Sequence, residues 1–388
     1  APTSVVTNWQ RELERFAPSL RPILLNELDS EARRTAAVEA VANDVVLTTY
    51  GVMSGEIETL AKVEWNVVCL DEAHTIKNRN TQMAQAATQL QAATRIALTG
   101  TPLQNHVSEV WSLFHFLNPG MLGTYEAFNR KFGNAEDGLS QQHLQRMLTP
   151  FILRRTKGEV IAELPEKTDI VRDVELTSEE LAAYETFRLR AKKQLEEEQK
   201  VSVTVLAEIT RLRQAACAVS LVAPELGLAS SKIGQLLELV EEIMQGDGHV
   251  LVFSQFTSFL ALVRERLERE GHQPLYLDGS TPMRERERLV QRFQAGERRI
   301  FIISLKAGGL GLNLTRANYV IHLDPWWNPA IEQQATDRSH RIGQRQAVTV
   351  YHLISRHTIE EKILRLHKTK RDLADSLLEG TARSSRLT

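Results

Sequence analysis

This sequence of 388 residues has no long apolar run, only two cysteines and a net charge close to zero. No apolar run reaches the roughly 18 residues that a membrane-spanning helix needs, and the first residues do not resemble a signal peptide. The two cysteines, Cys69 and Cys217, are far apart and lack the spacing of metal ligands. The small number and wide spacing of the cysteines exclude a zinc module and suit a reducing compartment. We expect Cys69, inside an apolar segment, to lie in the core.

The formal net charge is −2 at pH 7 and the isoelectric point is about 6.7. Overall charge therefore gives no sign of a nucleic-acid partner, and any such contact must come from local patches. Hydrophobic residues make up 42% and charged residues 25% of the chain, which is typical of a globular protein. This length leaves room for two or three domains.

Short valine-rich segments alternate with amphipathic segments in the first part of the chain. The expected strands, buried and parallel, are 45–48, 65–70 and 95–98, and the expected helices between them are 31–42 and 81–90. This alternation predicts an α/β fold with a parallel sheet. Beyond Pro102 the pattern changes, and we expect helices at 107–117 and 125–132 and long helices within 178–212.

A second α/β pattern follows Lys232. Its expected helices are 233–244, 257–270, 282–294 and 330–338, and its expected strands are 249–253, 273–277, 300–304, 319–323 and 348–353. These segments predict a second, complete parallel sheet. The tail, 358–378, has apolar residues near helical spacing and is expected to pack back on a lobe as a helix.

Two adjacent carboxylates, Asp71 and Glu72, come directly after the expected strand 65–70. Ligands of parallel α/β folds bind at the carboxyl ends of the strands. One carboxylate there can hold Mg²⁺, while its neighbour orients and deprotonates an attacking water during nucleotide hydrolysis. The alternative is a plain charge pair at a helix N-terminus, which is the commoner reason for such a pair.

The string D-E-A-H at 71–74, followed by L-T-G-T-P-L-Q-N at 98–105, resembles motifs II and III of the Swi/Snf ATPase family of helicase superfamily 2. The resemblance assigns Asp71 to the metal and Glu72 to the water. It also implies that Thr99 and Thr101 take part in DNA binding and couple it to lobe closure. The opening stretch 1–9 resembles motif Ia, which implies DNA contacts from Ser4 and Asn8.

Two segments of the second half also resemble motifs of this family, and a third, 278–281, places small hydroxyl groups after an expected strand. Residues 250–256 resemble motif IV, and 304–314 is a glycine-rich loop that resembles motif V. Glycines let the backbone approach phosphate oxygens, although such a loop alone is more often a plain turn. Residues implied here are Ser280 and Lys306 for DNA and Gly309 and Gly311 for the nucleotide.

The string D-P-W-W-N-P at 324–329 contains two adjacent tryptophans bounded by prolines. One helix face cannot bury both rings. We expect one ring to pack inward and Trp327 to touch DNA, with core packing of both positions left as an open alternative.

The stretch 333–344 resembles motif VI of the same family almost letter for letter. Its arginines, Arg338 and Arg341, are three positions apart and are predicted to share one helix face. Guanidinium groups can neutralise charge on a transferring phosphoryl group, with Gln334 completing the site. A solvent-exposed arginine pair is the alternative.

The resemblance covers nearly the whole chain and implies two RecA-like parallel-sheet lobes with α-helical insertions, the first lobe being incomplete. The expected parts are a partial first lobe at 1–105, a helical protrusion at 106–150, a linker and second insertion at 151–231, a second lobe at 232–357, and a brace helix and tail at 358–388.

The implied activity is ATP-driven movement along double-stranded DNA, with ATP and Mg²⁺ as cofactors. The implied partners are double-stranded DNA and a DNA-bound protein such as a nucleosome or a polymerase, and no membrane. A bacterial protein of the cytoplasm and nucleoid is favoured over a nuclear one, because no eukaryotic accessory domain is visible.

One element of the family pattern is absent, because no G-x-x-x-x-G-K-[ST] phosphate loop occurs in the sequence. The family places this loop before motif Ia, so the chain is expected to be a fragment with low nucleotide affinity. Two alternatives stay open: a catalytically silent DNA-binding module and a strand-separating helicase.

Overall fold

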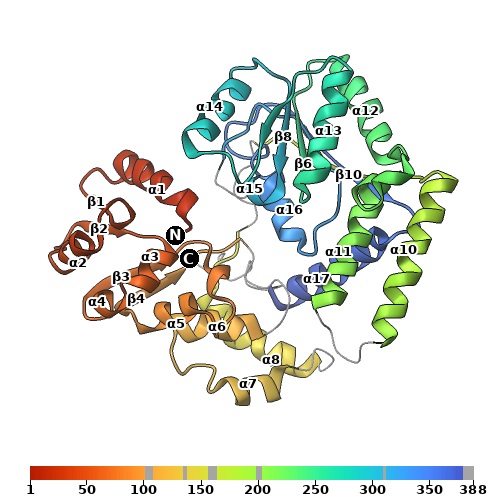
Figure 1. Cartoon of the computed structure of the whole chain (residues 1–388). Helices are drawn as coiled ribbons and strands as arrows, with labels where there is room; N and C mark the ends of the chain where they lie inside the picture. Colours follow the sequence, from red (N-terminus) through yellow and green to blue (C-terminus); the bar gives the residue numbers. More distant parts are fainter. Residues whose placement is uncertain (101–107, 134–137, 156–163, 198–202, 309–311, 379–388) are drawn as a thin grey trace. The chain divides into compact units, whose positions relative to one another are not determined.

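The computed structural model of the chain describes residues 1–100, 108–133, 138–155, 164–197, 203–308 and 312–378. It divides into two compact units, one made of Ala1–Arg154 with Lys370–Thr388 and the other of Arg155–Thr369. Both units contain parallel strands and helices (Figure 1), which confirms the predicted α/β class. In these described ranges, no helix combines the length and the apolar character needed to cross a membrane.

The first unit contains two parallel pairs of strands. β1 (Arg21–Leu24) pairs with β2 (Asp44–Leu47), and β3 (Glu64–Leu70) pairs with β4 (Gln91–Ala97). The helices around them are α1 (Thr3–Phe16), α2 (Ser30–Val38), α3 (Tyr50–Gly55), α4 (Ile57–Leu60) and α5 (Gln82–Gln89), with short 3₁₀ turns η1 (Leu25–Glu27) and η2 (Ala73–Ile76). The predicted strands and helices of this part are confirmed within a few residues, but β1 and α1 were not predicted.

The expected full burial of the strands at 45–48, 65–70 and 95–98 is wrong. β2 is only partly buried, and β4 has exposed positions along its length. Val68 and Leu70 lie in a core formed with α3 and α5, whereas Val67 is 52% exposed. Cys69 is also exposed, so its expected place in the core is wrong too. The reason is that successive side chains of a strand point to opposite faces, and the described part of this unit covers only one face of β3.

Aromatic residues hold together the helical part of the first unit. It consists of α6 (Ser108–Leu117), α7 (Tyr125–Phe132), α8 (Gly138–Leu148) and the turn η3 (Thr149–Phe151). Its core includes Trp111, Phe114 and Phe128, and Trp111 meets the ring of Tyr125 edge-on at 5.4 Å. The predicted helix at 125–132 is confirmed, and the one at 107–117 is confirmed from Ser108 onward.

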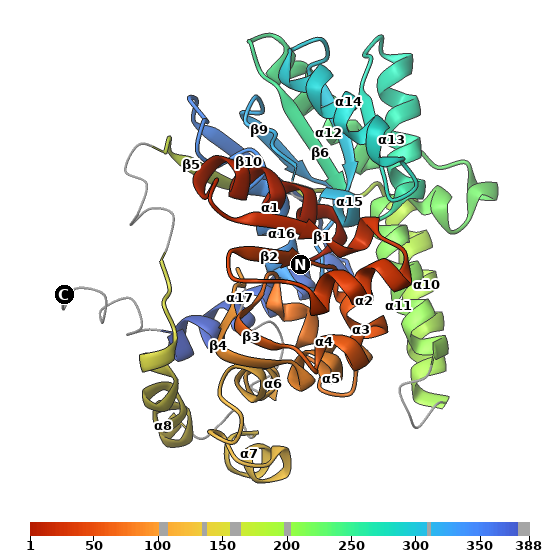
Figure 2. The ribbon, with the colours of Figure 1, turned by 90° about the vertical axis from the view of Figure 1, so that its left-hand side faces the viewer.

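The second unit contains a six-stranded parallel sheet with the order β5-β10-β9-β6-β8-β7. Figure 2 labels four of these strands, β5, β10, β9 and β6. The strands are β5 (Lys167–Val174), β6 (Val250–Ser254), β7 (Leu275–Leu277), β8 (Ile300–Ser304), β9 (Tyr319–His322) and β10 (Val348–Ser355). β5 comes from the segment that was expected to be a linker. Most of its side chains are polar or exposed, because it is an edge strand, and so no apolar run marks it.

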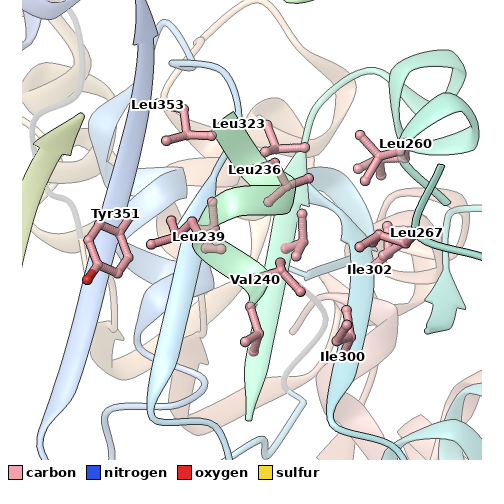
Figure 3. Close-up of a cluster of buried hydrophobic side chains, with 14 of the residues drawn as sticks. Leu236, Leu239, Val240, Leu260, Leu267, Ile300, Ile302, Leu323, Tyr351 and Leu353 are labelled. Atoms are coloured by element: carbon pink, nitrogen blue, oxygen red, sulfur yellow. The ribbon is translucent and has the colours of Figure 1, made fainter. Parts of the chain in front are cut away.

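Helices cover both faces of this sheet. The helices of this part of the chain are α10 (Ser178–Glu197), α11 (Val203–Cys217), α12 (Ser231–Met244), α13 (Thr257–Arg269), α14 (Met283–Gln294), α15 (Leu305–Gly308), α16 (Pro329–Thr336) and α17 (Ile359–Leu378), with turns η4 (Val219–Leu221) and η5 (Pro224–Leu226). The residues of α17 from Lys370 onward belong to the first unit. Leu236 on α12 and Leu260 on α13 pack in one core cluster with Ile302 of β8 (Figure 3). Phe293 on α14 and Phe301 of β8 belong to a second cluster, on the opposite face.

Candidate functional site

The carboxylate of Asp71 is held in place directly after β3. The indole Nε1 of Trp9 donates to Asp71 Oδ2 over 2.7 Å, and the backbone N–H of Glu72 donates to Asp71 Oδ1 over 2.9 Å. The hydroxyl of Tyr50 donates to the Asp71 carbonyl oxygen over 2.8 Å. Burial, together with the negative charge of Asp71, raises the pKa of Tyr50, so this hydroxyl stays a donor. The Trp9 contact was not predicted from the sequence.

Glu72 has a left-handed backbone conformation, with φ 50° and ψ 50°. Non-glycine residues adopt this region rarely, and it is frequent where a side chain must be aimed at a site. The Glu72 carboxylate lies 3.2 Å from Nδ1 of His74 and remains partly exposed. Two carboxylates at a strand end suit Mg²⁺, which is held in many nucleotide sites by one or two carboxylates and the phosphates themselves.

Among the described residues, no set of three His, Cys, Asp or Glu side chains could hold a metal by itself. The turn after β4 lies beside this pair: Leu98 N donates to Leu70 O over 2.8 Å, and Ala73 N donates to Leu98 O over 2.9 Å. Thr99 is therefore next to the carboxylates in the first unit.

The structure describes the other predicted residues of the first unit only in part. Thr101 lies outside the described residues. Asn8 is exposed on α1, and Ser4 lies on the same helix. Thus α1, which carries the segment resembling motif Ia, also supplies the Trp9 contact to Asp71.

In the second unit, Ser280 occupies a preformed turn at the end of β7. The Asp278 carboxylate accepts hydrogen bonds from Ser280 N and Ser280 Oγ, over 2.9 and 2.6 Å, and these bonds lower the pKa of Asp278. Arg286 donates to the carbonyl oxygens of Thr281, over 2.6 Å, and Gly279, over 3.0 Å. The exposed Ser280 is thus held at a rigid point where a phosphate could bind.

The remaining residues assigned to this unit come from the next strand ends. Lys306 is exposed on α15, directly after β8, while Gly309 and Gly311 lie outside the described residues. Trp326 packs against the second core cluster, and Trp327 is half-buried beside it.

The arginines expected on one helix face do not share one. α16 ends at Thr336, so Arg338 and Arg341 lie in the turns that follow, both half-buried, while Gln334 lies on the helix. The chain leaves the helix because the buried Ser339 hydroxyl donates to Thr336 O over 2.8 Å and Gln344 donates to Ser339 O over 3.1 Å. These turns, rather than a helical repeat, set the direction of each guanidinium group.

A buried acid on α16 and two stacked histidines on β9 and β10 were not predicted. Glu332 is 6% exposed, and its Oε1 accepts from Trp326 N over 2.6 Å. Burial raises the pKa of Glu332 to about 7. His352 Nδ1 lies 3.7 Å from Glu332 Oε2, and its ring stacks at 5.1 Å on the buried ring of His322.

The geometry thus forms two sets of candidate residues, one in each unit. Comparison with known proteins supports a common family for both. Residues 1–221 match the model of the SNF2-related domain, and residues 231–343 match that of the helicase conserved C-terminal domain.

Individual relatives agree with these matches. YwqA of Bacillus subtilis, whose name describes an ATP-dependent helicase/translocase, is 39% identical over 98% of this chain and 43% of its own length. The zebrafish (Danio rerio) chromodomain-helicase-DNA-binding protein 1-like is 34% identical over 97% of this chain and 38% of its own length. The chain therefore spans less than half the length of these curated relatives.

Among solved structures, the Sulfolobus solfataricus SWI2/SNF2 ATPase core in complex with dsDNA is 34% identical, with a TM-score of 0.48. The match covers 100% of this chain and 83% of that one. The SNF2-related domain model alone matches more than half of the 388 residues. This chain therefore belongs to the SNF2-related family.

Proposed function

We propose that the full-length protein hydrolyses ATP and uses the energy to move along double-stranded DNA. The observation that carries this proposal is the carboxylate pair Asp71–Glu72, fixed at the end of β3 by the contacts of Trp9 and Tyr50. In the proposed site Asp71 holds Mg²⁺, and Glu72 accepts a proton from the attacking water. Mg²⁺, when bound, neutralises charge on the phosphates.

The second unit supplies further residues that the proposal assigns to nucleotide hydrolysis. Arg338 and Arg341 stabilise the charge of the transferring phosphoryl group, Gln334 orients the reacting groups, and Gly309 and Gly311 approach the nucleotide through their backbone. We keep the five-part division at 1–105, 106–150, 151–231, 232–357 and 358–388 as a proposal.

DNA binding in this proposal is electrostatic and independent of sequence, because it rests on phosphate contacts. The residues assigned to it are Ser4, Asn8, Thr99, Thr101, Ser280, Lys306 and Trp327. Duplex affinity is then expected to fall steeply with salt concentration and to depend little on base sequence. The proposed protein partner is one that the motor displaces or moves on DNA.

The test is a comparison of three activities of the full-length protein: duplex-stimulated ATP hydrolysis, displacement of a third strand from a triplex, and unwinding of a fork. A translocase displaces the third strand without separating the duplex, and Glu72→Gln abolishes both hydrolysis and displacement. Efficient fork unwinding would instead identify a strand-separating helicase.

A catalytically silent DNA-binding module is the second candidate. It is favoured by one observation, the absence of a G-x-x-x-x-G-K-[ST] string from the 388 residues. Duplex binding by the full-length protein without hydrolysis above the Glu72→Gln level would establish that function and refute the motor.

A further inference from the structure

The guanidinium group of Arg213, on the insertion helix α11, lies buried among three aromatic rings. Arg213 is 5% exposed, and its Cζ lies 5.1 Å from the ring centroid of Trp327 and 5.5 Å from those of Trp326 and Phe256. Arginine next to an aromatic face is attractive, and more strongly so when water is excluded. One planar cation is therefore shared by both tryptophans of the loop at 324–329.

The same guanidinium also contacts the backbone of this loop. Arg213 Nη2 donates to the Pro325 carbonyl oxygen over 2.7 Å, and it lies 3.9 Å from Asp324 Oδ2. Asp324 in turn accepts from the side chain of Gln255, over 2.6 Å, and from the hydroxyl of Ser254 at the end of β6. The first half of the loop is thus joined to α11 and to the sheet.

Two further side chains hold the middle of the loop. Trp326 N donates to Glu332 on α16, and the Trp326 carbonyl oxygen forms a hydrogen bond with His367 Nε2 on α17. Arg213 contacts the rings of both tryptophans as well as the main chain of the loop. The sequence separation is large, because Arg213 and Pro325 are 112 positions apart.

We infer that Arg213 is a positioning residue that sets the orientation of Trp327 and so couples the helical insertion to the grip on DNA. The DNA part of this inference rests on the proposed function. Arg213 itself is buried and does not touch the nucleic acid; it acts through the ring of Trp327. A planar, delocalised cation is required, because a lysine ammonium cannot stack on rings and donate to a carbonyl in the same way.

The first test uses the chain itself, without DNA. Hydrogen exchange of the peptide at 324–337 is compared for the unsubstituted chain, Arg213→Met and Arg213→Lys, with Arg211→Met as the matched control. Arg211 lies on the same helix, but its side chain is 39% exposed and pairs with Glu208. We expect the loop amides to exchange about tenfold faster in Arg213→Met, less so in Arg213→Lys, and unchanged in the control.

The second test measures affinity for a labelled duplex in a double-substitution cycle with Trp327→Ala. If Arg213 acts through Trp327, Arg213→Met lowers affinity about three- to tenfold on its own and not at all in the Trp327→Ala background. Additive losses would overturn the inference, and so would loop exchange in Arg213→Met that matches the Arg211→Met control.

The two proposals fail in different ways. If the full-length protein without substitutions binds no duplex, the proposed function and the DNA part of this inference fall together, while loop exchange still decides the positioning role. Normal duplex binding with unchanged loop exchange in both Arg213 variants would overturn this inference alone.

Discussion

Lys232 and Glu360 form a fully buried ion pair, with Nζ of the lysine 2.6 Å from Oε2 of the glutamate and both side chains at most 1% exposed. The pair joins the start of α12 to the start of α17. The backbone N–H of Ser355 also donates to Glu360 Oε2, over 2.9 Å. Removing one partner from such a pair leaves an uncompensated charge in the interior.

We therefore expect Lys232→Met to lower the free energy of unfolding by about 3–5 kcal/mol. The double variant Lys232→Met with Glu360→Gln should recover most of this loss, because the remaining amide is neutral and still accepts from Ser355. Urea denaturation measures the stability of the single and the double variant. The exposed ion pair Arg264–Glu268 is the control, because breaking it should cost about 0.5 kcal/mol or less. A double variant as unstable as the single one would show that lost packing, not charge, is the cause.

The raised pKa of Glu332 makes the stability of the folded chain depend on pH. Burial raises its pKa from 4.5 to about 7, so the native carboxyl keeps a proton that the unfolded chain releases. This contribution to stability is fully present below pH 4.5 and is lost as the pH rises through about 7. Between pH 4.5 and about 7, the free energy of unfolding of the unsubstituted chain should fall by about 3 kcal/mol relative to that of Glu332→Gln.

The comparison uses unfolding of the two chains from about pH 5 to about pH 7.5. Burial lowers the pKa of His322, which has the opposite effect on stability. His322 is present in both chains, so its effect cancels in the difference. Parallel pH profiles would mean that Glu332 is ionised in the folded protein throughout this range.

Glu72 is expected to be the base of the proposed reaction. In the full-length protein, Glu72→Gln should lower ATP hydrolysis about 10²- to 10⁴-fold while ATP binding stays largely intact, since Asp71 remains to hold the metal. Single-turnover hydrolysis and equilibrium nucleotide binding separate the two effects, and Asp71→Asn should impair both. A joint loss of binding and hydrolysis in Glu72→Gln would make Glu72 a structural residue.

Arg338 and Arg341 are expected to act mainly in the transition state. Arg338→Ala and Arg341→Ala in the full-length protein should each lower DNA-stimulated turnover by about 10³-fold or more, with little change in nucleotide or DNA affinity. The exposed Arg345, close by in the sequence, supplies the control Arg345→Ala. Near-normal turnover would refute the assignment, and a matched loss of DNA affinity would make the pair a phosphate clamp.

Periodicity and apolar runs predicted most of this fold because the second sheet is buried on both faces. Strands such as β8 (Ile300–Ser304) are apolar throughout and therefore visible in the sequence. β5 (Lys167–Val174) was not visible, because an edge strand with a solvent-exposed face needs few apolar side chains. Cys69 was misplaced for a related reason, since an apolar segment does not reveal which of its faces is covered.

Motifs located the candidate residues but not their geometry. The strand end at Asp71 follows from the local pattern, whereas the Trp9 contact depends on how α1 packs in three dimensions. The turns around Arg338 depend on hydrogen bonds from Ser339 and Gln344, which helical spacing does not reveal. The Lys232–Glu360 pair spans 128 residues of sequence, beyond any periodic signal.

The contact of Arg213 with Pro325 and the two tryptophans has a consequence for how this family can diversify. A helical insertion whose buried arginine is also the common partner of another loop cannot be exchanged independently of that loop. An exchange of α11 between relatives would leave three rings and a proline carbonyl without their common partner unless an arginine is kept at this point. Variation along the insertion should therefore concentrate on its exposed positions, and the residue facing the tryptophans should change only together with them.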